Sequence, residues 1–223
     1  MLPISFKLYL ITDRQQTAGR HLLEVIRDIV VGAGLKPAPT KLQTTPQIAI
    51  QLREKDLSLR DQLNLALEIQ KITQEAGISL FINDRIDLAL AIDADGVHLP
   101  SAGLPIPVAR KMLGERKKIG VSCHSIDDVV RAESEGADFA VLGPIYDTPS
   151  KREYGAPLGV DYFVRVKQAT SIPLFAIGGI NMTRLSEVLG MGAYGVAMIS
   201  NIMKAENVEA QCRMILDAID KFK

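Results

Sequence analysis

The feature that most constrains the fold is a regular alternation of short apolar runs with longer segments of helical periodicity. Apolar runs of about four to eight residues are typical of buried strands, and longer segments with a period of about 3.6 residues are typical of helices. Alternating β and α segments predict a parallel sheet covered by helices, and eight such units predict a closed (β/α)8 TIM barrel of the α/β class. The expected strands are residues 8–11, 48–52, 80–82, 96–99, 118–121, 139–142, 173–177 and 195–199.

The segments between these strands predict the helices of the barrel. The expected helices are residues 19–31, 59–76, 85–91, 106–113, 126–135, 160–167, 182–190 and 208–222. The alternative is an open doubly wound sheet, which normally carries a G-x-G-x-x-G turn after its first strand. Here Thr12, Asp13 and Arg14 follow the first strand, so that fingerprint is absent. We therefore expect one barrel domain over residues 1–223.

A Gly/Pro-rich insertion, at about residues 32–46, interrupts the alternation between the first helix and the second strand. Its first part, residues 32–40, fits neither a helix interior nor a central strand, because proline removes a backbone donor and both residue types break regular structure. We expect this insertion at the amino-terminal face of the barrel, which usually serves stability rather than catalysis.

The charge balance and the cysteines exclude several classes of function. Lys plus Arg and Asp plus Glu each number 26, so no net field attracts nucleic acid or an anionic membrane. The start has no signal-peptide pattern, and no apolar run approaches the roughly 20 residues that span a bilayer. Cys123 and Cys212 lack a metal-binding spacing, which favours free thiols in the cytoplasm. The sequence leaves the oligomeric state open, a homo-oligomer included.

The end of the second strand carries two cations that alternation places on one face. Gln51, Arg53 and Lys55 share a face, opposite the apolar residues of the same strand. A guanidinium and an ammonium together suit a phosphate or pyrophosphate, and barrel enzymes place catalytic groups at the carboxyl ends of strands. The alternative is a surface ion pair with Glu54 or Asp56. We favour catalytic roles for Arg53 and Lys55, and substrate binding for Gln51.

The third and fourth strands end in residues whose roles the sequence leaves open. Asn83 and Asp84 follow the third strand, and taken alone they favour capping of the next helix. Asp84 could instead hold Mg²⁺, which prefers carboxylate oxygens together with water and substrate phosphates. His98, in the fourth strand, is either a packed histidine inside the barrel or a functional one.

The fifth strand ends with a serine and a histidine on the same face. Ser122 and His124 alternate together, and a histidine there could move protons near neutral pH. The alternative is that Ser125 caps the next helix and His124 packs beside it. Cys123 falls on the opposite face, so we do not expect it to be a nucleophile.

The last three strand ends predict phosphate binding. The loop after the sixth strand offers Thr148, Ser150 and Lys151 as donors, and residues 151–155 are the candidate for a loop that closes over substrate. Gly178 and Gly179 end the seventh strand, and barrels often bind phosphate between the seventh and eighth loops. Paired glycines allow the close approach that such binding needs. Ile199 and Ser200 end the eighth strand and complete the expected site.

Together these motifs resemble those of the thiamine phosphate synthases and of their relatives, the thiazole tautomerases. The resemblance covers nearly the whole chain apart from the Gly/Pro-rich insertion. Each matching segment is short, but their order and spacing are specific. The segments are residues 10–13, 51–55, 83–85, 95–99, 122–125, 143–151 and 177–180.

The resemblance to the synthases implies a reaction between two phosphorylated small molecules. A hydroxymethylpyrimidine pyrophosphate ionises, and the nitrogen of a thiazole phosphate attacks the cation, with pyrophosphate as leaving group. On this basis Gln51, Arg53, Lys55 and Asn83 would hold the pyrimidine and its pyrophosphate, and Asp84 would bind Mg²⁺. The remaining donors would bind substrate phosphate groups; these are Thr148, Ser150, Lys151, Gly178, Gly179 and Ser200.

One position departs from the synthase pattern. Synthases normally supply a second aspartate for Mg²⁺ after the fourth strand, and Gly103 stands there in this chain. Tautomerases also lack that aspartate, and a histidine at the position of His124 is their expected acid or base. The synthase is our first hypothesis and the tautomerase our second. The third is a non-catalytic barrel that binds thiazole or thiamine phosphate.

Overall fold

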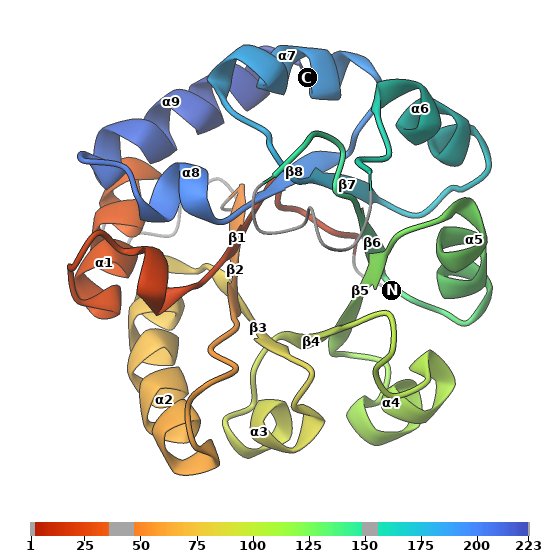
Figure 1. The fold of residues 1–223 in the computed structure, drawn as a ribbon. Coiled ribbons are helices and arrows are strands. Elements are labelled where there is room, and N and C mark those ends of the chain that lie inside the picture. Colours follow the sequence, from red (N-terminus) through yellow and green to blue (C-terminus); the bar gives the residue numbers. More distant parts are fainter. Residues whose placement is uncertain (1–2, 36–46, 149–155, 223) are drawn as a thin grey trace.

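The computed structural model forms a closed barrel of eight parallel strands, which pair in sequence order with the last strand against the first (Figure 1). It describes residues 3–35, 47–148 and 156–222. The strands are β1 (Leu8–Ile11), β2 (Ile48–Leu52), β3 (Ser79–Asn83), β4 (Gly96–Leu99), β5 (Lys118–Cys123), β6 (Phe139–Leu142), β7 (Leu174–Ile177) and β8 (Gly195–Met198). The (β/α)8 prediction is confirmed.

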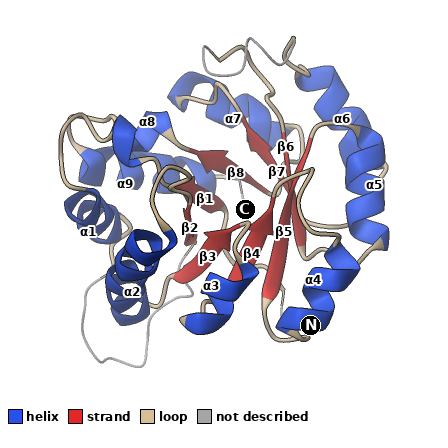
Figure 2. Ribbon diagram, turned by 60° about the horizontal axis from the view of Figure 1, so that its bottom comes forward, coloured by secondary structure: helices blue, strands red, loops and turns tan. Residues whose placement is uncertain are grey.

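Helices surround the strands on the outside of the barrel (Figure 2). They are α1 (Leu22–Gly32), α2 (Leu59–Ala76), α3 (Ile86–Ala91), α4 (Ile106–Leu113), α5 (Ile126–Ser134), α6 (Val160–Gln168), α7 (Met182–Gly190), α8 (Ser200–Met203) and α9 (Val208–Asp220). Side-chain oxygens of Ser58, Ser125, Asn181 and Asn207 accept a backbone N–H at the starts of α2, α5, α7 and α9. These caps explain why four of the helices begin where they do.

Aromatic rings fill the inside of the barrel below the carboxyl ends of its strands. Tyr9, Phe81, Phe139 and Phe175 point inward from four strands, and Phe6 joins them from the segment before β1. The ring centroids of Tyr9 and Phe139 lie 5.2 Å apart, and those of Phe81 and Phe139 lie 5.5 Å apart. Edge-to-face contacts of this kind stabilise a core beyond the area that they bury. We call these five rings the aromatic floor, and we call the carboxyl ends of the strands the mouth of the barrel.

The outer faces of the strands pack against the helices, as the period of two predicts. Ile48, Ile50 and Leu52 of β2 belong to this outer core, whereas Ala49 of the same strand belongs to the inner aromatic cluster. The sequence therefore assigned the two faces of β2 correctly.

The start of the Gly/Pro-rich insertion was placed one residue too early. Gly32 is the last residue of α1, and a Cβ there would lie 2.4 Å from the carbonyl oxygen of Glu209 in α9. Glycine at this position lets the two helices approach closely. Residues 36–46, which hold most of the expected insertion, lie outside the described residues.

No helix among the described residues is both long and apolar enough to cross a membrane.

A buried aspartate joins two strands and a helix at the amino-terminal end of the barrel. Asp138 precedes β6, and its carboxylate lies 2.6 Å from Arg110 of α4 and 2.8 Å from Lys118 of β5. The same carboxylate accepts the N–H of Ile119 at 2.8 Å. Two cations and a backbone donor therefore satisfy one buried anion, as buried charges require.

Candidate active site

The end of β2 is anchored from β1. The Gln51 side-chain amide is buried and donates to the Tyr9 hydroxyl at 3.2 Å. The backbone N–H of Arg53 donates to the buried hydroxyl of Thr12 at 3.0 Å. These two contacts fix the first two residues of the predicted cationic face at the mouth of the barrel.

The ion pairs that could have occupied Arg53 are made elsewhere. Asp56 pairs with Arg14 at 2.7 Å, and the Glu54 carboxylate accepts the backbone N–H of Arg14. Burial raises the pKa of Glu54, so this carboxyl holds its proton more readily than an exposed one. Within the described ranges neither carboxylate forms an ion pair with the Arg53 guanidinium. Lys55 is exposed in a turn beyond the end of the strand, so its inward placement stays a prediction.

Asp84 stands at the mouth of the barrel in an unusual backbone conformation. Its φ is +64°, and its N–H donates to the carbonyl oxygen of His98 in β4 at 2.9 Å. The capping role favoured for Asn83 or Asp84 is wrong, because Arg85 is the N-cap of α3 and no side chain caps that helix. Asp84 adopts a left-handed conformation in this turn, and its exposed side chain leaves the carboxylate accessible to a ligand.

The turn after β4 leaves no room for a second carboxylate at Gly103. The Gly103 N–H donates to the carbonyl oxygen of Pro100 at 2.9 Å, and a Cβ at Gly103 would lie 2.9 Å from the Pro100 ring. A side chain there would force this tight turn to move. Among the described residues no three His, Cys, Asp or Glu side chains gather as a metal site. A metal at Asp84 would therefore need further oxygens from substrate and water.

His98 lies inside the barrel, above the aromatic floor. Its Nε2 lies 2.9 Å from the Ser122 hydroxyl, and its ring centroid lies 5.6 Å from that of Tyr9. Burial, together with the nearby positive charge of Arg53, lowers the pKa of His98 to about 3. The imidazole is therefore neutral at physiological pH and holds the Ser122 side chain in place. Its Nδ1 is buried without a hydrogen-bond partner among the described residues.

The neutral state of His98 predicts a loss of stability in acid. The unfolded chain takes up a proton at His98 below its ordinary pKa, whereas the folded chain does so only near pH 3. Its stabilising contribution is thus complete above about pH 6.5 and is lost as the pH falls toward 3. We expect this loss to reach about 2 kcal/mol at pH 5. Urea unfolding between pH 7 and 4 should show a shallower pH dependence in His98→Asn than in the parent, and identical slopes would contradict the prediction.

His124 lies at the mouth with one ring nitrogen fixed. Its Nδ1 lies 2.7 Å from the carbonyl oxygen of Gly143. Because a carbonyl oxygen only accepts, Nδ1 carries the proton and Nε2 keeps a free lone pair. Ser125 caps α5, which is the first half of the alternative named for this segment. Cys123 is fully buried, and burial raises the pKa of its thiol to about 12. His124 is thereby oriented to accept a proton through Nε2.

The turn after β7 presents a row of backbone donors. Gly178 and Gly179 have φ values of +99° and +66°, which few other residue types adopt. Among the described residues, nothing accepts a hydrogen bond from the N–H groups of Gly178, Gly179 or Ile180. Successive N–H groups in a turn form a concavity that binds anions. The sequence predicted the two glycines but missed Ile180, because a backbone donor leaves no mark on residue type.

The start of α8 lies beside this glycine turn. Parallel pairing of Ile177 with Ala197 brings the loops after β7 and β8 together. Ile199 is the N-cap residue of α8 and Ser200 is its exposed first residue. The first N–H groups of a helix have no partner within it, so they add donors to the same edge.

Of the loop after β6, the structure describes the residues up to 148 and from 156 onward. The Thr148 hydroxyl is buried, with no hydrogen-bond partner among the described residues. Ser150, Lys151 and the candidate closing loop at residues 151–155 lie outside the described residues. Their phosphate-binding roles therefore stay predictions.

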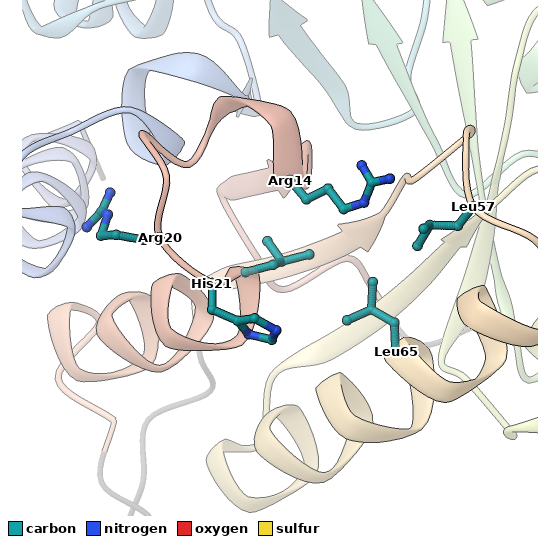
Figure 3. A pocket seen from close by; sticks show the side chains of 6 residues that line it. Arg14, Arg20, His21, Leu57 and Leu65 are labelled. Atoms are coloured by element: carbon teal, nitrogen blue, oxygen red, sulfur yellow. The ribbon is translucent and has the colours of Figure 1, made fainter.

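A cavity of about 450 Å³ opens between α1 and α2, outside the barrel (Figure 3). Its lining is Arg14, Arg20, His21, Leu22, Leu57 and Leu65. Figure 3 shows Arg20 turned away from the others, and its guanidinium donates to the carbonyl oxygens of Met203 and Ala205. Arg14 is paired with Asp56. Both guanidinium groups are engaged elsewhere, so we assign the chemistry to the barrel mouth.

The fold and the strand ends together define a (β/α)8 barrel with hydrogen-bond donors gathered at the carboxyl ends of its strands. A profile of the thiamine monophosphate synthase family matches residues 8–202, and the chain belongs to this family. The resemblance predicted from short motifs is thereby confirmed. Membership makes the chain a transferase of thiamine biosynthesis.

Individual relatives cover almost the whole chain. A protein from Geobacter sulfurreducens is 44% identical over 97% of this chain and 95% of its own. The thiamine-phosphate synthase of Clostridium novyi is 38% identical over 96% of this chain and 98% of its own. The solved thiamine phosphate pyrophosphorylase from Pyrococcus furiosus superposes with a TM-score of 0.83 at 31% identity, covering 98% of this chain and 97% of that one.

Proposed function

We propose that this chain joins hydroxymethylpyrimidine pyrophosphate to thiazole phosphate and releases pyrophosphate. The observation that carries the proposal is that two groups of hydrogen-bond donors lie on one rim of the barrel. One is the pair Gln51 and Arg53, and the other is the turn of Gly178, Gly179 and Ile180, whose N–H groups have no acceptor among the described residues. If each group binds one anion, the two suit two phosphorylated substrates.

The arm at the end of β2 suits the leaving pyrophosphate. Negative charge develops on the leaving group as the bond to the pyrimidine carbon breaks, and fixed donors aimed at that charge lower the barrier. Arg53 supplies a planar fork of N–H donors, which matches phosphate oxygens. Gln51, held by Tyr9, and Asn83 supply amides for the pyrimidine, and Lys55 adds a second cation.

Asp84 fits Mg²⁺ as a single protein ligand. Its carboxylate is exposed at the mouth and caps no helix. Mg²⁺ keeps several waters and often takes only one or two carboxylates beside substrate phosphates, so the glycine at position 103 does not prevent binding. When bound, Mg²⁺ would take up part of the charge on the pyrophosphate.

The opposite side of the mouth suits the thiazole phosphate. The glycine turn, Ile199 and Ser200 line one edge, and we place Thr148, Ser150 and Lys151 around the same phosphate. Ser122, held by neutral His98, lies between the two anion sites in strand order and has a hydroxyl for the ring of either substrate.

We also propose that the protein is cytoplasmic and that its partners are phosphorylated small-molecule substrates, not nucleic acid or a membrane. The two free, buried cysteines support a reducing compartment.

The test is a synthase assay on the intact chain. The protein is incubated with both phosphorylated precursors, once with Mg²⁺ and once with a chelator, and thiamine phosphate is measured. We expect product with Mg²⁺ and little product with the chelator. Absence of product from folded protein would contradict the proposal.

A second candidate function is proton transfer on a thiazole carboxylate phosphate, the tautomerase reaction. The observation that favours it is the fixed orientation of His124, whose Nε2 is left as an acceptor by the contact with Gly143. If this reaction occurs, His124→Ala should slow it by about 10²-fold or more, because general acid–base catalysis contributes about that much. Conversion between the two thiazole tautomers measures the rate. A His124→Ala variant as fast as the parent would exclude the second function.

A further inference from the structure

Helix α7 contacts both loops that frame the thiazole phosphate site. The Arg184 guanidinium donates to the carbonyl oxygen of Gly179 at 2.7 Å. The same guanidinium lies over the ring of Tyr146, 4.4 Å from its centroid. The Tyr146 hydroxyl in turn donates to Glu187 of α7 at 2.5 Å. One arginine thus touches the turn after β7 and the loop after β6.

The two loops are also joined through their backbones. Ile145 donates to the carbonyl oxygen of Ile177 at 2.8 Å, and Tyr146 donates to that of Gly178 at 3.1 Å. A Cβ at Gly179 would lie 2.8 Å from Cβ of Tyr146. Burial, together with the bond to Glu187, raises the pKa of Tyr146 to about 12, so its hydroxyl stays protonated and keeps donating. The contact between these loops is therefore close-packed and specific.

Arg184 affects the N–H of Ile180, because this N–H and the carbonyl oxygen that Arg184 contacts belong to the same peptide group. In a trans peptide the C=O and N–H point in opposite directions, so a carbonyl of Gly179 held toward α7 turns the N–H of Ile180 away from α7. A charged donor on the carbonyl also polarises the peptide and strengthens its N–H as a donor. The N–H of Ile180 is one of the three free donors of the glycine turn.

We infer that Arg184 is a positioning residue for the thiazole phosphate site, acting through the Gly179–Ile180 peptide rather than by touching substrate. This inference rests on the proposed function, because it assigns the glycine turn to the thiazole phosphate. It makes α7 part of the apparatus that recognises phosphate, although Arg184 belongs to none of the motifs shared with the family.

The test compares the two substrates in one enzyme. In Arg184→Gln we expect KM for thiazole phosphate to rise about tenfold, since hydrogen bonds to charged groups contribute an amount of that order. KM for the pyrimidine pyrophosphate should change by less than about twofold, because that substrate binds at the other site. Arg184→Lys keeps the charge and should recover most of the loss. Equal rises in both KM values, or no recovery with lysine, would overturn the inference.

A matched control and a second measurement separate this inference from the proposed function. Arg165 of α6 also lies over a tyrosine, 5.2 Å from the ring centroid of Tyr162. Within the described residues it makes no hydrogen bond or ion pair with the loops after β6 and β7. Arg165→Gln should leave both KM values unchanged. Calorimetry with inorganic phosphate on the intact parent and on Arg184→Gln needs no turnover. Weaker phosphate binding in Arg184→Gln than in the parent supports the inference even if no thiamine phosphate forms, and equal binding in the two proteins refutes it.

Discussion

An Arg53→Ala enzyme should lose about 10³-fold in kcat/KM for thiamine phosphate formation and keep the melting temperature of the parent. Fixed donors aimed at developing charge are worth about that much when one is removed. Stability should change little because, within the described ranges, neither neighbouring acid holds the guanidinium. Steady-state kinetics with both precursors, together with thermal melting, measure the two effects.

Two further arginine variants sharpen this prediction. Arg53→Lys keeps the charge but loses the planar fork, so it should recover only part of the lost activity. Arg14→Gln removes another arginine from the same rim, one that pairs with Asp56, and should keep nearly full activity. If Arg14→Gln is as damaged as Arg53→Ala, then net positive charge at the mouth, rather than the position of Arg53, supports the reaction.

Replacing Asp138 by alanine should lower the free energy of unfolding by about 3–5 kcal/mol, the usual cost of removing one partner from a buried ion pair. The substitution would remove the carboxylate that pairs with Arg110 and Lys118, whose side chains are only 13% and 16% exposed. The backbone N–H of Ile119 would also lose its acceptor. Urea unfolding of the parent and of the variant at pH 7 gives the difference.

An exposed ion pair on the same face is the control for Asp138. Asp93 pairs with Lys117, but the side chain of Asp93 is 92% exposed. Solvent screens such pairs, so Asp93→Asn, which removes the charge and tolerates the left-handed backbone of this residue (φ +54°), should leave the urea midpoint almost unchanged. Equal losses from Asp93→Asn and Asp138→Ala would show that burial does not set the size of the effect.

The eight strands could be predicted from the sequence because each is a short apolar run followed by a longer segment with helical periodicity. The two short helical elements could not be predicted. The 3₁₀ helix at Arg14–Gln16 and α8 at Ser200–Met203 are too short to complete a recognisable apolar repeat. Residue 199 was assigned to the last strand, but its ψ of −88° takes the chain out of the strand and into α8.

The candidate site was predictable where it depends on strand alternation and topology. Gln51 and Ser122 follow from period two within a strand, and the strand order brings them to one rim. The argument weakens beyond the strand end, where Glu54 is buried and Lys55 is exposed. The partner of Arg184 is a backbone carbonyl in a left-handed turn, and residue type alone does not reveal which way such a carbonyl points.

The aromatic floor divides the positions of this barrel into two groups with separate effects. Substitutions below it, among Phe6, Phe81, Phe139 and Phe175, remove packed rings and act on folding. The strand ends above it, such as Arg53 and His124, carry the proposed chemistry and belong to neither hydrophobic core cluster. A directed-evolution library confined to the upper layer could therefore search for new substrates while the folded state stays intact.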